Sequence, residues 1–377
     1  MQGLFIQRHA EVAAAFANVS VLYLCAAPEK PNGFEIIQTI ENEVNTVIVY
    51  YGTRLSIPNI IAQPVKAVLF VKAFLKGYKK CYPLLKPDLV HVNVLTRMGL
   101  FALWLKVCNG IRYVITEHWS RYLPTVATYK GVFRKMATRL VVKYASVVST
   151  VSKDLALAMK QHNLLNNKYI VLPNVVDTGN FMLSKIKKDD HKKRILHISC
   201  FEDRSKNISG LLRTIKQLSL HRDDFECEMV GDGTDFERMK SYANQLGLDN
   251  TVLNFRGLLE NDQVIESYQT ADFMVMFSNY ENMPVVISES FACGVPVIAT
   301  KVGGIPEYVN ESNGILIDKQ DEMALLNALN YMLDHCEEYD KTAIRAMAVE
   351  TFGNKAVAAK LKEIYVSAGL NFTDLKQ

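Results

Sequence analysis

The stretch that decides the fold is residues 278–309, SNYENMPVVISESFACGVPVIATKVGGIPEYV. Pro284 suits the first turn of a helix, where its missing N–H group would have no partner, and Gly294 is typical of the residue that ends one. We therefore predict a helix over Val285–Ala292, followed by the apolar strand Pro296–Ala299. A helix followed at once by a buried strand is typical of an α/β fold.

Short apolar runs alternate with helical patterns along almost the whole chain. The predicted strands are Val19–Ala26, Thr46–Tyr51, Leu89–Val94, Arg112–Thr116, Val147–Val151, Tyr169–Leu172, Ile195–Ser199, Glu226–Val230, Val252–Phe255, Phe273–Phe277, Pro296–Ala299 and Ile315–Ile317. Strands rich in Val and Ile that alternate with helices are typical of parallel sheets covered by helices on both faces. We expect an α/β protein made of two Rossmann-like domains.

A polar segment separates the two halves. Residues 184–194 read SKIKKDDHKKR, with one apolar residue, which is typical of a linker. The charge changes sign at the same place: residues 1–183 hold 21 Lys/Arg against 9 Asp/Glu, and residues 184–377 hold 22 against 30. We predict one domain over 1–183, a linker over 184–193, a second domain over 194–350, and a C-terminal helix within 351–377 that packs back toward the first domain.

The composition, with 49% hydrophobic and 22% charged residues, is that of a folded globular protein. It excludes disordered, collagen-like and small disulfide-rich proteins. No apolar run approaches the roughly 18–20 residues that span a bilayer. The seven cysteines are scattered without a CxxC pair, which favours reduced thiols over a metal site or a disulfide framework. We therefore expect a cytoplasmic protein.

Basic residues gather on two predicted helices of the first half. Four lysines fall on one side of the helical pattern Pro64–Leu85: Lys72, Lys76, Lys79 and Lys80. A second stripe, Lys135, Arg139 and Lys143, recurs every four residues. Basic amphipathic helices bind anionic lipid, so the stripes indicate peripheral contact with the inner face of the membrane. The alternative is a solvated helix face. We find no nucleic-acid-binding motif and expect no nucleic-acid partner.

Two carboxylates stand eight residues apart in the deciding stretch. Glu281 lies on the loop before the predicted helix, and Glu289 lies just over one turn inside it. The free N–H groups around Met283–Val286 and the positive end of the helix dipole form an anion site suited to a diphosphate. A carboxylate beside it can accept hydrogen bonds from a ribose or sugar diol. The alternative for the bare pair is a capping acid and a solvent-facing glutamate.

Together with the proline, the glycine stop and the GGIPE turn at 303–307, this block resembles the donor-binding signature of retaining glycosyltransferases of family 4, which have the GT-B architecture. Other segments are similar to the same family: LVHVN (89–93), YVITEHWS (113–120), SVVSTVS (146–152), VLPNVVD (171–177), HISCFEDRSKN (197–207), VGDG (230–233) and FRG (255–257). The resemblance covers nearly the whole chain. It implies an acceptor-side first domain and a donor-binding second domain that face a central cleft.

The resemblance assigns roles to individual residues. Lys206, with Arg204 as its companion, matches the cations on the donor diphosphate, Glu281 the carboxylate near the donor sugar, and Glu289 the one on the ribose. His118 would face the donor sugar from the first domain. The remaining donor-binding candidates are Asn282, Met283, Pro284, Gly231, Gly233, Phe255, Gly257 and Leu258.

The implied reaction moves a sugar from a nucleoside-diphosphate sugar to a glycan or lipid-linked acceptor, with retention, in cell-surface polysaccharide or glycolipid synthesis. No DxD pair stands at a strand end and no His/Cys/Asp cluster suggests ligands, so we expect neither a metal nor a cofactor. Lys206, Arg204 and the helix start would stabilise the leaving diphosphate. The alternatives are a nucleotide-sugar epimerase, a sugar-phosphate phosphorylase, and a non-catalytic nucleotide- or glycan-binding module on the same fold.

The beginning of the chain departs from this pattern. An open α/β domain usually opens with a buried strand, whereas MQGLFIQRHAEVAAAF reads as a helix and the first predicted strand is Val19–Ala26. Gly3, Leu4 and Phe5 look like the tail of the family's Gly-containing loop. We expect the first domain to lack a central strand, as in a fragment or a mis-assigned start.

Overall fold

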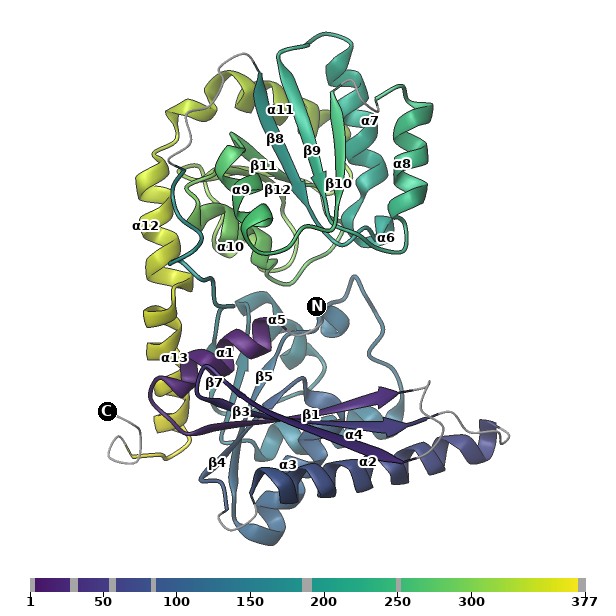
Figure 1. Cartoon of the computed structure of the whole chain (residues 1–377), viewed down its shortest axis with the longest axis vertical. Helices are drawn as coiled ribbons and strands as arrows, with labels where there is room; N and C mark the ends of the chain where they lie inside the picture. Colours follow the sequence, from purple (N-terminus) through teal and green to yellow (C-terminus); the bar gives the residue numbers. More distant parts are fainter. Residues whose placement is uncertain are drawn as a thin grey trace.

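The structure is a computed structural model that describes residues 4–27, 33–53, 59–82, 86–184, 192–248 and 252–371. Figure 1 shows two domains stacked along the long axis of the molecule. Gly3 and residues 185–191, which make up most of the predicted linker, lie outside the described residues.

The N-terminal domain carries two separate sheets, with strand orders β1-β3-β2 and β4-β5-β6-β7. Its elements are α1 (Leu4–Ala14), β1 (Val19–Ala27), β2 (Phe34–Glu41), β3 (Val44–Gly52), α2 (Asn59–Cys81), β4 (Leu89–Asn93), α3 (Leu95–Asn109), β5 (Arg112–Glu117), η1 (Ser120–Tyr122), α4 (Val132–Tyr144), β6 (Val147–Thr150), α5 (Lys153–Gln161) and β7 (Tyr169–Val171). The predicted helix Pro64–Leu85 begins earlier, at Asn59, and ends at Cys81; residues 83–85 lie outside the described part.

The expectation of wholly parallel sheets is wrong for one pair. β2 was not predicted, and it pairs with β3 in the antiparallel direction. The two strands are joined by Asn42 and Glu43, whose φ angles are both positive, 49° and 61°. This is the backbone of a tight hairpin turn. β2 is exposed along nearly its whole length, so it lacks the alternation of buried residues that would have revealed it.

The second domain contains one six-stranded sheet of order β10-β9-β8-β11-β12-β13, in which every described pair is parallel. Its elements are β8 (Lys193–Ile198), α6 (Asp203–Lys206), α7 (Ile208–Ser219), β9 (Phe225–Val230), α8 (Phe236–Gln245), β10 (Leu253–Gly257), α9 (Asp262–Thr270), β11 (Phe273–Met276), α10 (Val285–Ala292), β12 (Val297–Thr300), η2 (Ile305–Glu307), β13 (Gly314–Ile317), α11 (Glu322–His335), η3 (Cys336–Glu338), α12 (Lys341–Phe352) and α13 (Asn354–Ser367).

The last two helices join the domains. α12 packs on α10 of the second domain, and α13 then runs down beside the first domain (Figure 1). Val357 and Leu361 of α13 share an apolar cluster with Val12 and Phe16 of the first domain. The break between the helices falls at Gly353, where a side chain would meet the Val349 carbonyl oxygen at 2.5 Å.

Candidate active site

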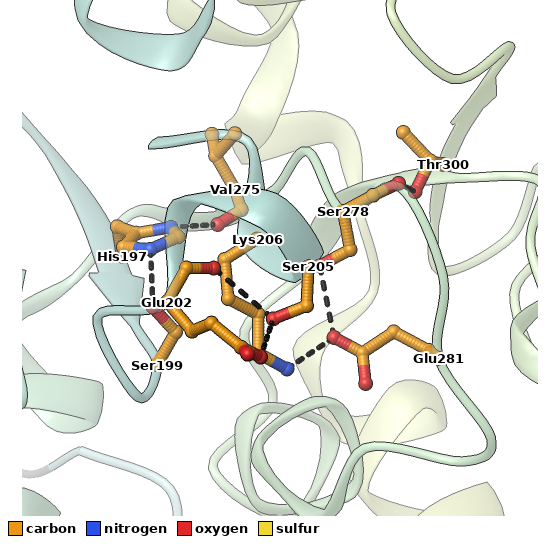
Figure 2. A network of polar contacts seen from close by, with 9 residues as sticks. All are labelled: His197, Ser199, Glu202, Ser205, Lys206, Val275, Ser278, Glu281 and Thr300. Atoms are coloured by element: carbon orange, nitrogen blue, oxygen red, sulfur yellow. Dashed lines mark hydrogen bonds and ion pairs between the residues drawn. The ribbon is translucent and has the colours of Figure 1, made fainter. Parts of the chain in front are cut away.

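Lys206 and Glu281 form an ion pair at the carboxyl edge of the second sheet (Figure 2). Lys206 ends α6, which follows β8, and Glu281 lies on the loop after β11. β8 and β11 are neighbouring parallel strands, so their following loops meet at one edge. Both side chains are nearly buried, with 13% and 10% of their surface exposed. Burial opposes the charge of Lys206, but the Glu281 carboxylate outweighs it and raises the pKa of Lys206.

Hydrogen bonds hold the two loops in place around this pair. Ser278 Oγ donates to Glu281 Oε1 over 2.9 Å, and Thr300 Oγ1 donates to the Ser278 carbonyl over 2.7 Å. On the Lys206 side, Ser205 Oγ donates to the Glu202 carboxylate over 2.7 Å (Figure 2). A buried network with its members paired fixes side chains before a ligand arrives.

His197 lies beneath the same loops and is fully buried. Its Nδ1 is 3.0 Å from the Val275 carbonyl oxygen, and its Nε2 is 2.8 Å from Ser199 Oγ. The carbonyl can only accept, so Nδ1 carries the proton of the neutral ring. Burial lowers the pKa of His197 from 6.5 to about 4.

This neutral histidine predicts acid sensitivity. The unfolded chain takes up the proton near pH 6.5 and the folded chain only near pH 4, so the stabilisation is complete above pH 6.5 and is lost as the pH falls toward 4. Between pH 7 and pH 4.5 the loss from this group is about 2–3 kcal/mol. Denaturant unfolding at pH 7 and pH 4.5 measures how much the free energy of unfolding falls between the two pH values. In His197→Gln this fall should be smaller by about 2–3 kcal/mol than in the unaltered protein. The same fall in both proteins would contradict a neutral, buried His197.

Gly303 fixes the position of the Glu281 loop. Its φ is +55°, and a Cβ atom at this position would lie 1.9 Å from the Glu281 carbonyl oxygen. Gly304 N donates to the Asn282 carbonyl over 2.6 Å, so the GGIPE turn packs directly beneath this loop. Only a residue without a side chain allows this approach.

Gly303→Ala should therefore lower the free energy of unfolding by more than about 2 kcal/mol, since left-handed strain alone costs roughly 1–2 kcal/mol and the clash adds to it. Gly110→Ala is the matched control: its φ is +73°, but a Cβ there would meet nothing within 4 Å. Denaturant unfolding of both variants is the measurement. If both variants lose the same free energy of unfolding, the close approach of Gly303 to the Glu281 carbonyl does not contribute to stability.

The Glu289 carboxylate contacts one side chain from each domain. Arg8 Nη1, on α1, lies 3.2 Å from Glu289 Oε1, and the Tyr268 hydroxyl on α9 donates to Oε2 over 3.1 Å. Burial raises the pKa of Glu289, while Arg8 opposes that shift. Sequence reasoning missed Arg8 and Tyr268. Arg8 lies 281 residues from its partner, so no local spacing could reveal the pair.

His118 and Asn282 connect the domains beside Glu281. His118 follows β5, and its carbonyl oxygen accepts from Asn282 Nδ2 over 2.5 Å. Asn174, also of the first domain, donates to the Met283 carbonyl over 3.2 Å. The imidazole Nε2 of His118 is 3.1 Å from Asn93 Oδ1. Burial lowers the pKa of His118 well below its ordinary value, which keeps the ring neutral.

Several buried polar atoms at this junction lack a hydrogen-bond partner of ordinary geometry in the described part of the chain. They are His9 Nδ1, Asn279 Oδ1 and Asn282 Oδ1, whereas the His118 and Asn174 side chains interact with each other. An unpaired buried polar atom costs free energy unless water or a ligand satisfies it. Their gathering where the two domains meet indicates a site that awaits a polar ligand.

The glycine turns lie at the edge of the sheet beside this junction. Gly231 N donates to the Gly257 carbonyl over 2.8 Å. A Cβ on Gly231 would lie 1.9 Å from the Ser199 carbonyl oxygen, so this turn requires glycine. A Cβ on Gly233 would likewise lie 2.7 Å from the backbone nitrogen of Phe201. Phe255 packs against the rings of Phe201 and Phe236, so an aromatic cluster lies next to these turns.

The other predicted residues lie in different surroundings. Arg204 is exposed, and it meets the site loop through its backbone: its carbonyl accepts from Asn279 Nδ2 over 3.0 Å. Met283 is buried, Pro284 directly precedes α10, and Leu258 is 63% exposed. The sequence did not predict that the Glu117 and Glu307 carboxylates would accept hydrogen bonds from backbone N–H groups. Glu117 is buried and accepts from the backbone N–H groups of Leu95, His118 and Trp119.

Glu307, the last residue of the GGIPE turn, connects the two domains. Its carboxylate accepts from the backbone N–H groups of Lys153 and Asp154, each over 2.9 Å, at the start of α5. These are free donors of a helix N-terminus, where a carboxylate is favoured. The described residues contain no group of three or more His, Cys, Asp and Glu side chains placed to hold a metal ion.

Two family descriptions together account for most of the chain. Residues 7–180 match Glycosyltransferase Family 4, and residues 180–348 match Glycosyl transferases group 1. The chain belongs to glycosyltransferase family 4, group 1. The junction between the two matches falls close to the predicted domain boundary at residue 183.

Curated relatives of this glycosyltransferase align over part of their length. TuaC of Bacillus subtilis, which is named for teichuronic acid biosynthesis, is 29% identical over 250 residues, 65% of this chain and 61% of TuaC. N-acetyl-alpha-D-glucosaminyl L-malate synthase of Bacillus anthracis is 27% identical over 292 residues, 74% of each chain. The matched part thus spans less than two thirds of TuaC.

Solved structures share the architecture at low sequence identity. Sucrose-phosphate synthase from Thermosynechococcus elongatus superposes with a TM-score of 0.78 at 19% identity, covering 97% of this chain and 93% of that one. HepE of Anabaena, solved with UDP-glucose, gives 0.70 at 17% identity, covering 92% and 99%. The fold is therefore the α/β GT-B arrangement that the sequence resemblance predicts.

Proposed function

We propose that this glycosyltransferase moves a sugar from a nucleoside-diphosphate sugar to a hydroxyl group of a glycan or lipid-linked acceptor, with retention of anomeric configuration. The observation that carries the proposal is the buried Lys206–Glu281 pair, which stands beside unpartnered polar atoms of both domains. A cation beside a carboxylate suits a ligand that places a diphosphate next to a sugar. HepE, a structural neighbour, was solved with UDP and with UDP-glucose, which supports this donor class.

Lys206 acts on the leaving group in this proposal. The bond between the anomeric carbon and the diphosphate oxygen breaks, and the departing diphosphate gains negative charge. Lys206 stabilises that charge electrostatically, assisted by the backbone N–H groups at the start of α10. Arg204 is exposed near the same loop and supplies a second cation once its side chain turns inward. This chemistry needs no metal ion.

Retention follows from attack on the face that the leaving group vacates. The acceptor oxygen bonds to the anomeric carbon from the side of the diphosphate, and a diphosphate oxygen takes the acceptor's proton. Glu281 orients the sugar hydroxyls, and His118, neutral and buried, hydrogen-bonds the sugar from the first domain. Trapping of a covalent sugar adduct on Glu281 would overturn this route in favour of double displacement.

The test is incubation of the protein with labelled UDP-, GDP- and ADP-sugars and a panel of glycan and lipid-linked acceptors, with and without EDTA. Label transferred to an acceptor with its anomeric configuration retained, at equal rates in EDTA, supports the proposal. A free epimerised sugar nucleotide, or binding without turnover across the whole panel, would contradict it. TuaC is named for teichuronic acid biosynthesis, so the panel should include polysaccharide acceptors.

We further propose that the first domain rests on the inner face of the membrane. α2, α3 and α4 form one layer: Phe70 and Phe74 of α2 contact Phe101 of α3, and α3 packs on α4. No helix in the described ranges has the length and apolar character needed to cross a bilayer. The layer instead exposes large apolar side chains: Val68, Val71, Leu75, Leu100, Trp104, Val107, Val132, Phe133, Met136 and Leu140.

Exposed basic residues accompany these apolar ones on the outer two helices. Lys72, Lys76, Lys79 and Lys80 are exposed on α2, and Arg139 and Lys143 on α4. Apolar side chains flanked by cations suit the boundary between anionic headgroups and acyl chains. The layer would bring a lipid-linked acceptor to the site.

Replacing Lys72, Lys76, Lys79 and Lys80 together by glutamine should weaken binding to vesicles containing phosphatidylglycerol at least tenfold, because each lysine contributes about 1 kcal/mol near an anionic surface. The matched control replaces four lysines of the second domain, Lys216, Lys240, Lys301 and Lys319, with the same loss of charge. Co-sedimentation with vesicles is the measurement. Equal weakening of vesicle binding in the two variants would contradict a membrane-binding face on α2.

A further inference from the structure

β2 lies at the end of the sheet β1-β3-β2 and leaves one edge of its backbone free along eight residues, Phe34–Glu41. Three other strands that end a sheet, β7, β10 and β13, have only three, five and four residues. Short edge strands, lysine and proline are the usual means by which a protein prevents its sheet edges from pairing. β2 is long, and its sequence FEIIQTIE contains no lysine, arginine or proline.

Helix α2 packs on β3 and β1 of this sheet but leaves β2 exposed at every position except Phe34. Ile36 pairs with Val49, which packs against α2, so Ile36 and Ile40 lie on the same face of the sheet as that helix. Ile37 lies on the opposite face. An edge strand that exposes β-branched side chains on both faces is a surface for association.

The hairpin turn determines which backbone groups of β2 are free. Asn42 and Glu43 form a two-residue turn, so Glu41 and Val44 are a hydrogen-bonded pair of the β2–β3 ladder. Hydrogen-bonded pairs recur at every second residue, so the odd-numbered residues of β2 point their N–H and C=O groups at β3. The even-numbered residues point theirs at the free edge, where no strand of the described ranges pairs with them.

We propose that β2 is the interface of a symmetric homodimer, in which the β2 strands of two copies pair in the antiparallel direction with Ile37 opposite Ile37. The two three-stranded sheets would form one continuous sheet of six strands. The even-numbered residues of the two copies would exchange roughly eight backbone hydrogen bonds. Such a twofold interface needs no second kind of protein, because the same strand supplies both sides.

The apolar side chains favour this register. It places Phe34 of each copy opposite Ile40 of the other, an aromatic and β-branched pair of the kind that stabilises antiparallel strands. Ile40 is 73% exposed in the single chain. On the opposite face, Ile37 lies beside Ile48, and Ile48 lies beside Tyr23. The dimer would join two such rows into one apolar row across the symmetry axis.

The charges disfavour the neighbouring registers. In the proposed pairing, Glu35 lies opposite Thr39, whose hydroxyl group can donate to the carboxylate. A shift of the symmetry centre to Gln38 would place Glu35 of each copy opposite Glu41 of the other, and like charges directly opposite destabilise a strand pair. A shift by one residue the other way would place Glu35 opposite the apolar side chain of Ile37.

We expect a weak dimer in solution, with a dissociation constant of about 1–100 μM, because one strand pair buries less than the roughly 1,200 Å² of a standard interface. In an antiparallel edge pairing the symmetry axis is perpendicular to the sheet, so the α2 helices of both copies lie on the same side of it. Both copies would therefore present the proposed membrane-binding layer to one bilayer. The pairing itself stands apart from the proposed function, because strands can pair whether or not the protein transfers sugars.

The test is sedimentation equilibrium of the unaltered chain and of two variants, Ile37→Lys and Ile37→Glu. Each variant alone sets like charges opposite each other and should raise the dissociation constant at least fivefold. An equal mixture of the two sets opposite charges together and should dimerise within twofold of the unaltered chain. Leu220→Lys and Leu220→Glu are the matched controls, at an exposed site in the second domain, and should leave the dimer unchanged.

A second arm uses only the unaltered chain and therefore does not depend on the folding of a variant. Hydrogen exchange over residues 34–41, followed by mass spectrometry, should be at least threefold slower at about 500 μM protein than at about 5 μM, because the monomer fraction falls. Exchange over residues 297–300 should be the same at both concentrations. Exchange over 34–41 that is independent of concentration, a monomer at every concentration, or a dimer that both Ile37 variants leave unchanged would overturn the inference.

Discussion

Replacement of Lys206 by alanine should lower kcat for sugar transfer by about 10²- to 10³-fold, the usual cost of removing one preorganised group that stabilises developing charge. Lys206 is nearly buried against Glu281, so its charge acts on a diphosphate bound beside it through a lower effective dielectric than that of water. The loss should fall on kcat more than on KM, since the diphosphate gains its extra charge only as the bond to the sugar breaks. Steady-state kinetics with the donor that the labelled panel identifies is the measurement.

Lys193→Ala is the matched control for this variant. Lys193 pairs with Glu337 in the same domain, away from the site, and the Glu337 side chain is 76% exposed. Kinetics of the control should equal those of the unaltered protein. Thermal unfolding of both variants is needed as well, because removing Lys206 leaves the Glu281 carboxylate without its cation. A folded Lys206→Ala protein with normal kcat would show that the leaving group is stabilised elsewhere.

Replacement of Glu289 by alanine should weaken the binding of a nucleoside diphosphate about 100-fold. Within the described ranges, each Glu289 oxygen has one protein partner, Arg8 or Tyr268, and a carboxylate oxygen can accept a second hydrogen bond, here from a ribose hydroxyl. A hydrogen bond to a charged group contributes about 1.5–3 kcal/mol, so losing a diol contact costs at least that amount. Calorimetric titration with UDP, GDP and ADP measures the change.

The 2′-deoxy nucleotide supplies the sharper comparison. The unaltered protein should prefer the ribonucleoside diphosphate to its 2′-deoxy form, and Glu289→Ala should bind the two equally. Glu322→Ala, which breaks the exposed pair with Arg213, is the control and should keep the preference. If Glu289→Ala still discriminates between the two nucleotides, the ribose does not bind at Glu289.

Much of the fold could be predicted from the sequence because its strands are buried on both faces. The runs VVSTV (147–151) and FMVMF (273–277), which contain no charged residue, carry that signal, and both contain strands, β6 and β11. β2 lacks this signal. It is an exposed antiparallel edge strand, so neither an apolar run nor alternating burial reveals it, and its hairpin turn uses Asn42 and Glu43 in place of glycine.

Only those site residues that lie close together in the sequence could be predicted from their spacing. Glu281, Pro284 and Glu289 sit on one loop and one helix, so their spacing carries information. The partners that define their environment come from elsewhere: Lys206 from the loop after β8, Arg8 from α1, and Asn174 from the first domain. Such contacts arise from the packing of two domains, and no spacing within a single segment encodes them.

The most direct test of the central claim is a crystal structure of the protein with the nucleoside diphosphate that binds most tightly. The account predicts the diphosphate within hydrogen-bonding distance of Lys206 Nζ and of the backbone N–H groups before α10, with the ribose hydroxyls on the Glu289 carboxylate. A nucleotide bound with its phosphates remote from Lys206 and its ribose remote from Glu289 would contradict it.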